Sequence, residues 1–377
     1  MHGADARGSN KWIVWPLITA VVALTTACDA PSPQRETRVG YIEREWTDPN
    51  RAAWNGATDW PISAAIWYPA AADAIEAPFV IGPPGLPFLL RGWVARDAPP
   101  ARAAKALPLI LLSHGTGGSR SDLYWLAERL VQDGYVVAAV THHGNSIQSD
   151  DLTAQGFFLF WERALEMTAL LDHVLKDDVF GPRIDRTRIG AAGFSLGGNT
   201  MALLAGGRLD IEAYYESCQG PEADAADCEP PPESPFTVAD LETLIENNAR
   251  VRASIESANN DWREERIRAV YAIAPAVLAA LSQSGAAQIE IPLRIAVGDK
   301  DTMAPLATNA QPFSESAPEA ELWILSGVDH YTFLGPCGWA GKLVLGEICA
   351  ESPQLPRNQT LERVAADASA FFGRTLR

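Results

Sequence analysis

The segment Gly193-Phe194-Ser195-Leu196-Gly197-Gly198 constrains the fold of this chain more than any other. It follows an apolar run at 188–192 that is typical of a buried strand, and it precedes a helical pattern at 199–205. A serine on a tight strand-to-helix turn needs glycine two positions before and two positions after it, because side chains there would collide with the neighbouring strand and helix. Both glycines are present. The pattern predicts a turn that exposes the Ser195 hydroxyl at the carboxyl edge of a sheet, beside the first N–H groups of a helix.

A serine becomes nucleophilic when a histidine takes its proton and a carboxylate orients that histidine. For a serine at such a turn, the chain order is serine, acid, histidine. His330 is the only one of the six histidines that follows Ser195, and it comes just after a strand pattern at 321–325. We therefore predict by elimination that His330 is the base.

Three aspartates compete for the role of the acid. Asp299 and Asp301 follow a strand pattern at 291–297, and Asp329 directly precedes the histidine. We disfavour Asp329, because it would have to fold back onto its own neighbour. Asp299 and Asp301 both remain candidates, with a helix cap or a turn as the structural alternative for Asp299.

A glycine-rich segment at 113–118 follows another apolar run at 107–112. Glycines allow backbone N–H groups to approach a substrate oxygen on which negative charge develops, so this segment is the candidate oxyanion hole. We expect His114, within it, to be structural. His142 and His143 could suggest a metal site, but adjacent side chains point apart and no second cluster supplies further ligands. We therefore expect no metal and no other cofactor.

Five segments give the chain a resemblance to a known family: 112–120, 125–130, 134–140, 193–198 and 330–334. Over 107–207 and 267–372, the chain resembles the bacterial predicted dienelactone hydrolases, which are similar to platelet-activating factor acetylhydrolases of the α/β-hydrolase superfamily. The resemblance favours Asp301 as the acid, because Asp301 and Pro305 match the acid loop of that superfamily. It also implies that the N–H groups of Thr116 and Leu196 form the oxyanion hole.

The nucleophile position departs from the true dienelactone hydrolases, which resemble this fold but use a cysteine where this chain has Ser195. This departure favours the hydrolysis of carboxylic esters over lactone ring opening. The resemblance therefore implies a serine esterase that cleaves short-chain or lipid-like esters through an acyl-enzyme. Two alternatives remain open: an amidase or peptidase on the same fold, and a cell-surface binding lipoprotein without catalytic activity.

The length of 377 residues and an apolar content of 47% are sufficient for one large core. Strand patterns at 38–45 and 62–68, with six more that end near Leu112, Val140, Ala192, Ala274, Val297 and Leu325, bring the count to eight. Helical patterns alternate with them at 122–133, 158–176 and 358–372. The prediction is an α/β-hydrolase domain over 38–377, with an eight-stranded, mostly parallel sheet flanked by helices.

Two segments interrupt this pattern. Residues 208–265 contain two polar helical stretches, at 238–247 and 250–262, and we expect this insertion to form a cap that shapes the pocket. Residues 78–108 are rich in glycine, proline and large apolar side chains. We interpret them as a loop that lines an acyl pocket, meets a membrane or packs on the core.

The amino end has the pattern of a targeting segment. Two basic residues precede an apolar run at 12–27, which is typical of a signal peptide and short for a membrane span. Thr25-Thr26-Ala27-Cys28 resembles the lipobox of bacterial lipoproteins, although the usual leucine three residues before the cysteine is Thr25. We predict a signal peptide over 1–27, an acylated Cys28 that anchors the protein to a membrane, and a tether over 28–37. The protein would then be exported to the periplasm or cell surface, with plain secretion as the alternative.

Without Cys28, the chain has four cysteines, Cys218, Cys228, Cys337 and Cys349, an even number that permits disulfides in an exported protein. Pairing Cys218 with Cys228 and Cys337 with Cys349 closes the shortest loops. The net charge of −17 disfavours nucleic acid as a partner, since no basic cluster offsets it.

Overall fold

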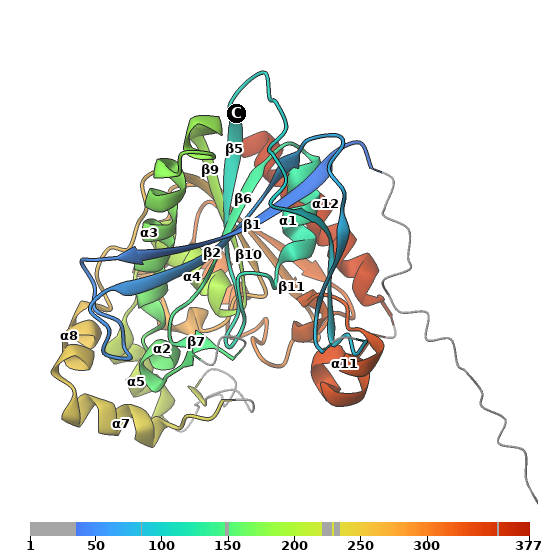
Figure 1. Cartoon of the computed structure of the whole chain (residues 1–377). Coiled ribbons are helices and arrows are strands. Elements are labelled where there is room, and N and C mark those ends of the chain that lie inside the picture. Colours follow the sequence, from blue (N-terminus) through green and yellow to red (C-terminus); the bar gives the residue numbers. More distant parts are fainter. Residues whose placement is uncertain (1–34, 84, 148–150, 221–227, 230–233, 353) are drawn as a thin grey trace, which may run out of the picture.

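The computed structural model describes residues 35–83, 85–147, 151–220, 228–229, 234–352 and 354–377. The predicted signal peptide and Cys28 lie outside the described residues. The main feature is a ten-stranded sheet with the strand order β12-β11-β10-β9-β5-β6-β2-β1-β4-β3. Helices cover both of its faces (Figure 1).

The strands of this sheet are β1 (Arg38–Asp48), β2 (Trp60–Ala70), β3 (Ala77–Ile81), β4 (Leu89–Arg96), β5 (Leu107–Ser113), β6 (Val136–Thr141), β9 (Ile184–Phe194), β10 (Ile267–Ile273), β11 (Leu293–Gly298) and β12 (Ala320–Leu325). A separate two-stranded sheet consists of β7 (Asn145–Ser146) and β8 (Asp151–Leu152).

The α-helices are α1 (Tyr124–Gln132), α2 (Ala154–Phe158), α3 (Arg163–Lys176), α4 (Leu196–Leu204), α5 (Ile211–Cys218), α7 (Val238–Asn247), α8 (Ala249–Ser257), α9 (Gln283–Ala286), α10 (Ala310–Ser316), α11 (Trp339–Val344) and α12 (Arg357–Thr375). Short 3₁₀ helices are η2 (Phe160–Glu162), η3 (Gly181–Arg183), η4 (Leu278–Ala280), η5 (His330–Phe333) and η6 (Gly346–Cys349).

Six neighbouring strands, from β6 through β5, β9, β10 and β11 to β12, are parallel. Strand β2 is antiparallel to β6 and to β1. Parallel strands buried on both faces appear in a sequence as continuous apolar runs, and β5 and β6 are buried along nearly their whole length for this reason. The carboxyl ends of β5, β9, β11 and β12 meet at one edge of the sheet, so the loops that follow them lie near one another.

Two apolar cores flank the sheet. Helices α3 and α4 cover one face, with Met167, Leu170 and Met201 fully buried, and helices α1 and α12 cover the other, with Leu126 and Val364 fully buried. The mostly parallel sheet between helical layers confirms the predicted fold class.

The structure has two more strands in the main sheet than the eight predicted. Residues 78–108, interpreted as a loop, instead contain most of β3, all of β4 and the start of β5. Strand β4 pairs with β1 in parallel and with β3 in antiparallel orientation, so this hairpin extends the sheet at its β1 edge. The loop interpretation was wrong because free backbone groups on β1 offered pairing partners that the composition of 78–108 does not reveal.

The helix predicted over 158–176 is also interrupted. Leu159 has φ −91° and ψ 53°, which ends α2, and the 3₁₀ helix η2 precedes α3. In the insertion, by contrast, α7 has the predicted bounds, and α8 begins one residue before the predicted start and ends at Ser257.

Both shortest-loop disulfides are present: Cys218 is bonded to Cys228 and Cys337 to Cys349. The first lies in the insertion and the second follows η5. Among the residues that the structure describes, no helix combines the length and apolar character that a membrane span requires.

Candidate active site

Ser195 lies between the end of β9 and the start of α4, with φ 55° and ψ −120°. A positive φ is unfavourable for a residue with a side chain, so the surrounding structure must hold this conformation. The backbone N–H of Ser195 donates to the carbonyl of Ile273 at 2.9 Å, and its own carbonyl accepts from Ala276 at 3.1 Å. These bonds tie the turn to the segment after β10.

The two glycines that flank the serine are required by close backbone contacts. A Cβ on Gly193 would lie 2.2 Å from the carbonyl oxygen of Gly197, and a Cβ on Gly197 would lie 2.2 Å from the carbonyl oxygen of Ser113. Backbone atoms cannot yield as a flexible side chain can. The turn therefore packs directly against the end of β5.

Three predicted side chains form a continuous chain of hydrogen bonds. His330 Nε2 lies 2.9 Å from Ser195 Oγ, and His330 Nδ1 lies 2.7 Å from Asp301 Oδ2. Ser195, His330 and Asp301 are 8%, 5% and 6% exposed, so the chain is nearly shielded from solvent. The residues come from the loops after β9, β12 and β11, which the parallel sheet brings to one edge.

The second carboxylate oxygen of Asp301 accepts hydrogen bonds from the backbone N–H groups of Met303 at 3.0 Å and Ala304 at 2.8 Å. These two donors fix the orientation of the carboxylate. The oxygen that faces His330 is consequently available to accept the Nδ1 proton of the imidazole, which leaves Nε2 unprotonated toward Ser195.

The other candidate acids have different partners. Asp299 accepts from the Gly327 N–H at 2.7 Å and from Ser326 Oγ at 3.0 Å, so it joins the turns after β11 and β12. The hydrogen bond from Gly327 lowers the pKa of the Asp299 carboxyl. Asp329 caps η5 by accepting from the Thr332 N–H at 2.9 Å.

The glycine-rich segment 113–118 adjoins Ser195. A Cβ on Gly115 would lie 3.1 Å from the Ser195 Cβ, so the backbone next to Thr116 reaches the nucleophile position. Leu196 is the first residue of α4, where an N–H group has no partner within its own helix. Within the described part of the chain, neither the Thr116 N–H nor the Leu196 N–H donates a hydrogen bond.

A second chain of serine, histidine and acid lies inside the protein. His142 Nε2 lies 2.8 Å from Ser113 Oγ, and His142 Nδ1 is hydrogen-bonded to Glu166 on α3. Ser113, His142 and Glu166 are 0%, 1% and 2% exposed. Ser113 lies within β5, without the strained turn and helix N-terminus that accompany Ser195. This chain of hydrogen bonds is therefore structural. It anchors β5, the strand that leads to the glycine-rich segment 113–118, which we call the candidate oxyanion loop.

Helix α3 also holds that loop through a buried cation. Arg163 donates to the carbonyl of His114 at 2.7 Å and to Asn145 Oδ1 at 2.9 Å. The same oxygen of Asn145 accepts from the Gly117 N–H at 2.8 Å. Sequence reasoning did not identify Arg163, Asn145 or Glu166; the only signal was an arginine and a glutamate three apart on one predicted helix.

Burial changes the pKa values of these interior groups. Burial, assisted by neighbouring positive charge, lowers the pKa of both His114 and His142 well below the usual value of 6.5. Burial raises the pKa of Glu166 to about 7. His114 donates from Nδ1 to the Gly115 carbonyl at 2.6 Å and accepts the His142 N–H at Nε2 at 3.0 Å, which agrees with a neutral ring in a structural role.

The adjacent histidines point to different partners, as expected. The backbone N–H of Trp54 donates to His143 Nε2 at 3.1 Å, whereas His142 contacts Ser113 and Glu166. Across the residues that the structure describes, no three histidine, cysteine or carboxylate side chains gather in a way that could hold a metal ion.

Comparisons with known proteins find a matching family model, similar sequences and a similar solved structure. A family model described as platelet-activating factor acetylhydrolase, isoform II, matches residues 94–155. Cutinase est1 of Thermobifida alba is 25% identical over 213 residues, which cover 56% of this chain and 48% of that protein. Lipase 1 of Moraxella sp. (strain TA144) is 34% identical over 93 residues, which cover 25% of this chain and 26% of that protein. A solved ferulic acid esterase from Streptomyces cinnamoneus matches with a TM-score of 0.57 and 18% identity over 92% of each chain.

The chain has the α/β-hydrolase fold. The structural match covers nearly all of both chains and shows the fold. The chain spans about half the length of the Thermobifida alba cutinase and a smaller share of the Moraxella lipase. The predicted resemblance to platelet-activating factor acetylhydrolases is confirmed over 94–155, and the resemblance to dienelactone hydrolases stays a prediction.

Proposed function

We propose that this α/β hydrolase is a serine esterase that cleaves carboxylic esters through an acyl-enzyme intermediate. The observation that carries the proposal is the hydrogen-bonded chain from Ser195 through His330 to Asp301, which begins at a strained strand-to-helix turn. Similarity to a cutinase, a lipase and an acetylhydrolase family supports esters as the substrate class.

Acylation follows from the geometry of these groups. Ser195 Oγ attacks the ester carbonyl carbon while His330 Nε2, 2.9 Å away, takes the hydroxyl proton. Asp301 accepts the Nδ1 hydrogen bond and stabilises the imidazolium that forms. The carbonyl oxygen gains negative charge, and the N–H groups of Thr116 and Leu196 are the donors that we propose stabilise it.

Collapse of this intermediate breaks the bond between the carbonyl carbon and the alcohol oxygen. His330 returns its proton to the departing alkoxide, so the alcohol leaves neutral and the acyl group stays on Ser195. A water molecule then attacks the acyl-enzyme with His330 again as the base. This step releases the carboxylic acid and restores the Ser195 hydroxyl.

The insertion between α4 and β10 is our candidate for a cap that selects the substrate. The insertion contacts α2 and η2: Trp161 Nε1 on η2 donates to Ser254 Oγ on α8 at 3.0 Å, and the ring of Phe157 on α2 lies 5.8 Å from that of Phe236, which precedes α7. A cap anchored in this way would restrict the acyl or alcohol groups that reach Ser195.

We further propose that the protein is exported, with Cys28 acylated as a membrane anchor. Both disulfides support export, because disulfides persist in oxidising compartments. Metabolic labelling with a fatty acid, compared between the wild-type protein and a Cys28→Ala variant, tests the anchor. Label in both proteins would contradict it.

Hydrolysis of a series of p-nitrophenyl esters, from acetate to palmitate, tests the activity. We expect turnover by the purified protein and a loss of at least about 10³-fold in the Ser195→Ala variant. Ser113→Ala is the matched control, since Ser113 also contacts a histidine but is fully buried, and it should still react with a fluorophosphonate at Ser195. A folded wild-type protein that neither cleaves an ester nor reacts with the fluorophosphonate would refute the proposal.

A further inference from the structure

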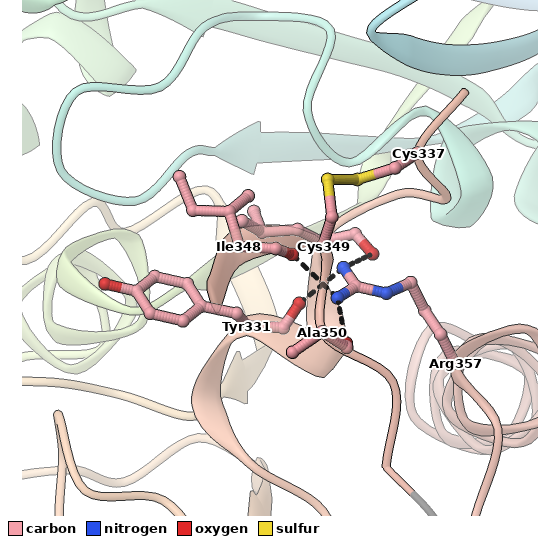
Figure 2. Close-up of a disulfide and its surroundings, with 7 residues drawn as sticks. Tyr331, Cys337, Ile348, Cys349, Ala350 and Arg357 are labelled. Carbon is pink, nitrogen blue, oxygen red and sulfur yellow. Dashed lines mark hydrogen bonds between the residues drawn. A yellow bond between two sulfur atoms is a disulfide. The ribbon is translucent and has the colours of Figure 1, made fainter. Parts of the chain in front are cut away.

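A buried cation lies behind the histidine of the candidate site. Arg357, the first residue of α12, is 1% exposed. Its Nη1 donates to the carbonyls of Tyr331 at 2.6 Å and Leu334 at 3.1 Å, and its Nη2 donates to those of Ile348 at 2.7 Å and Ala350 at 2.8 Å. Figure 2 shows the guanidinium between these two short segments.

The four carbonyls lie at the ends of two 3₁₀ helices. Tyr331 and Leu334 belong to the end of η5, and Ile348 and Ala350 to the end of η6. The last carbonyls of a helix have no partner within it and carry partial negative charge, which a cation stabilises. Within the described residues, no carboxylate lies within 4.0 Å of the Arg357 guanidinium. The backbone carbonyls are therefore its main partners.

A disulfide joins the same two segments. Cys349 lies between Ile348 and Ala350, and its partner Cys337 lies three residues after Leu334. Both cysteines are buried, at 6% exposure each. Arg357 and the disulfide thus form two cross-links, one polar and one covalent, between the chain that follows His330 and the chain around Cys349 (Figure 2).

We propose that Arg357 is a positioning residue for His330, and that the segment closed by the Cys337–Cys349 disulfide is the support against which it holds η5. The proposal rests on the proposed function, because it concerns the base of that reaction. Arg357 binds the carbonyl of Tyr331, the residue next to His330. Displacement of η5 would therefore move the imidazole away from Ser195.

Asp301 cannot replace this support. Its hydrogen bond to Nδ1 fixes the rotation of the imidazole ring but leaves the backbone of η5 free to shift. The Asp329 cap holds η5 at its start, and Arg357 holds its end. A misplacement of about 1 Å can cost about 100-fold in rate, so loss of one of these restraints should be measurable in turnover.

Two substitutions test the arginine. Arg357→Gln removes the charge and most of the donors, and Arg357→Lys keeps the charge with a different donor geometry. With active sites counted by fluorophosphonate titration, we expect kcat for an ester to fall about 10- to 100-fold in Arg357→Gln, with KM within about twofold. Arg357→Lys should recover part of the loss. A purely stabilising role would lower the unfolding temperature without changing kcat per titrated site.

The two disulfides supply a matched comparison. They close loops of similar sequence separation, 12 residues for Cys337–Cys349 and 10 for Cys218–Cys228. Replacing Cys337 and Cys349 with serine should lower kcat. The Cys218–Cys228 disulfide lies in the candidate cap, so its replacement is a control for the His330 resonance described below and not for kcat. When Arg357→Gln is combined with the serine replacements at Cys337 and Cys349, the fold-loss in kcat should be smaller than the product of the two separate fold-losses. Both changes act through the segment that holds η5.

A spectroscopic measurement separates this proposal from the esterase activity. The His330 Nδ1 proton, shared with Asp301, should resonate far downfield in the proton NMR spectrum, and its absence in His330→Gln identifies it. We expect this signal to shift or broaden in Arg357→Gln and to stay unchanged in the Cys218 and Cys228 control, whether or not any ester is cleaved. An unchanged signal and wild-type kcat in Arg357→Gln would overturn the proposal. If that variant does not fold, the same results in both Arg357→Lys and the serine pair at Cys337 and Cys349 would overturn it.

Discussion

Replacing Asp301 with asparagine tests the candidate catalytic chain at the position where the sequence left two aspartates open. One oxygen of Asp301 accepts from the N–H groups of Met303 and Ala304, and the other faces His330 Nδ1 at 2.7 Å. An asparagine that keeps its oxygen on the two N–H groups presents its NH₂ group to His330. The imidazole must then carry its proton on Nε2, where it cannot accept the proton of Ser195.

The size of the effect follows from the cost of avoiding this tautomer. Turning the amide around leaves two N–H groups, that of Ala304 buried and that of Met303 partly buried, without an acceptor, at about 1–3 kcal/mol each. The total of about 2–6 kcal/mol corresponds to roughly 30-fold to 20,000-fold at about 1.4 kcal/mol per factor of ten. We expect kcat for a p-nitrophenyl ester to fall about 10³-fold in Asp301→Asn, with KM little changed.

Asp299→Asn is the matched control, because Asp299 follows the same strand two residues earlier but contacts Gly327 and Ser326. We expect its kcat to stay within about twofold of the wild-type value. Circular dichroism and urea midpoints show whether both variants are folded. The reasoning is refuted if Asp301→Asn keeps kcat within tenfold of the wild type, or if Asp299→Asn loses as much as Asp301→Asn.

Two further predictions concern the packing beneath the site. Gly197→Ala should give little folded protein, because the new Cβ would lie 2.2 Å from the Ser113 carbonyl oxygen at the end of β5. Gly373→Ala, where the new Cβ enters open space on α12, should fold normally and be slightly more stable. Equal yields of soluble protein from the two variants would contradict this prediction. Stability should fall as the pH drops from 6.5 to 4.5. His114 and His142, whose pKa values are lowered on folding, each bind a proton only in the unfolded chain, while Glu166, whose pKa is raised to about 7, binds one only in the folded chain. Between these pH values the unfolded chain therefore binds more protons at these three groups than the folded chain, so the free energy of unfolding should decrease as the pH falls. Urea unfolding with no loss of stability between pH 6 and pH 5 would contradict this.

All eight strands expected from the sequence are present. Central strands such as β5 and β6 are buried on both faces, so each leaves a continuous apolar run that can be recognised locally. The hairpin of β3 and β4 left no such run. It forms because β4 pairs with β1, as in the register of Gly40 with Ala95, and this partner lies more than fifty residues away in the chain. Pairing across that distance depends on the assembled sheet rather than on the composition of the segment.

Some residues of the candidate site could likewise be predicted from the sequence, and others could not. The glycine pattern around Ser195 and the chain order of the histidines are local or countable features, so the sequence alone led to Ser195 and His330. Asp299 and Asp301 are two residues apart and chemically identical, and the residues themselves did not separate them. The structure turns Asp301 toward His330 and Asp299 toward Gly327.

By itself, the sequence determined the elements that depend on neighbours in the chain: the alternation of strands and helices and the tight turn at Ser195. It favoured the two short disulfide loops among three possible pairings, and the structure has them. Only the tertiary structure determined the partners of the buried charges. Glu166 and Arg357 are charged residues on helices, a pattern that usually indicates exposure to solvent. Glu166 instead binds His142 beneath the candidate oxyanion loop, and Arg357 binds four carbonyls behind His330. A buried charge is stabilised by groups that folding brings to it from distant parts of the chain, and no local pattern records which groups these are.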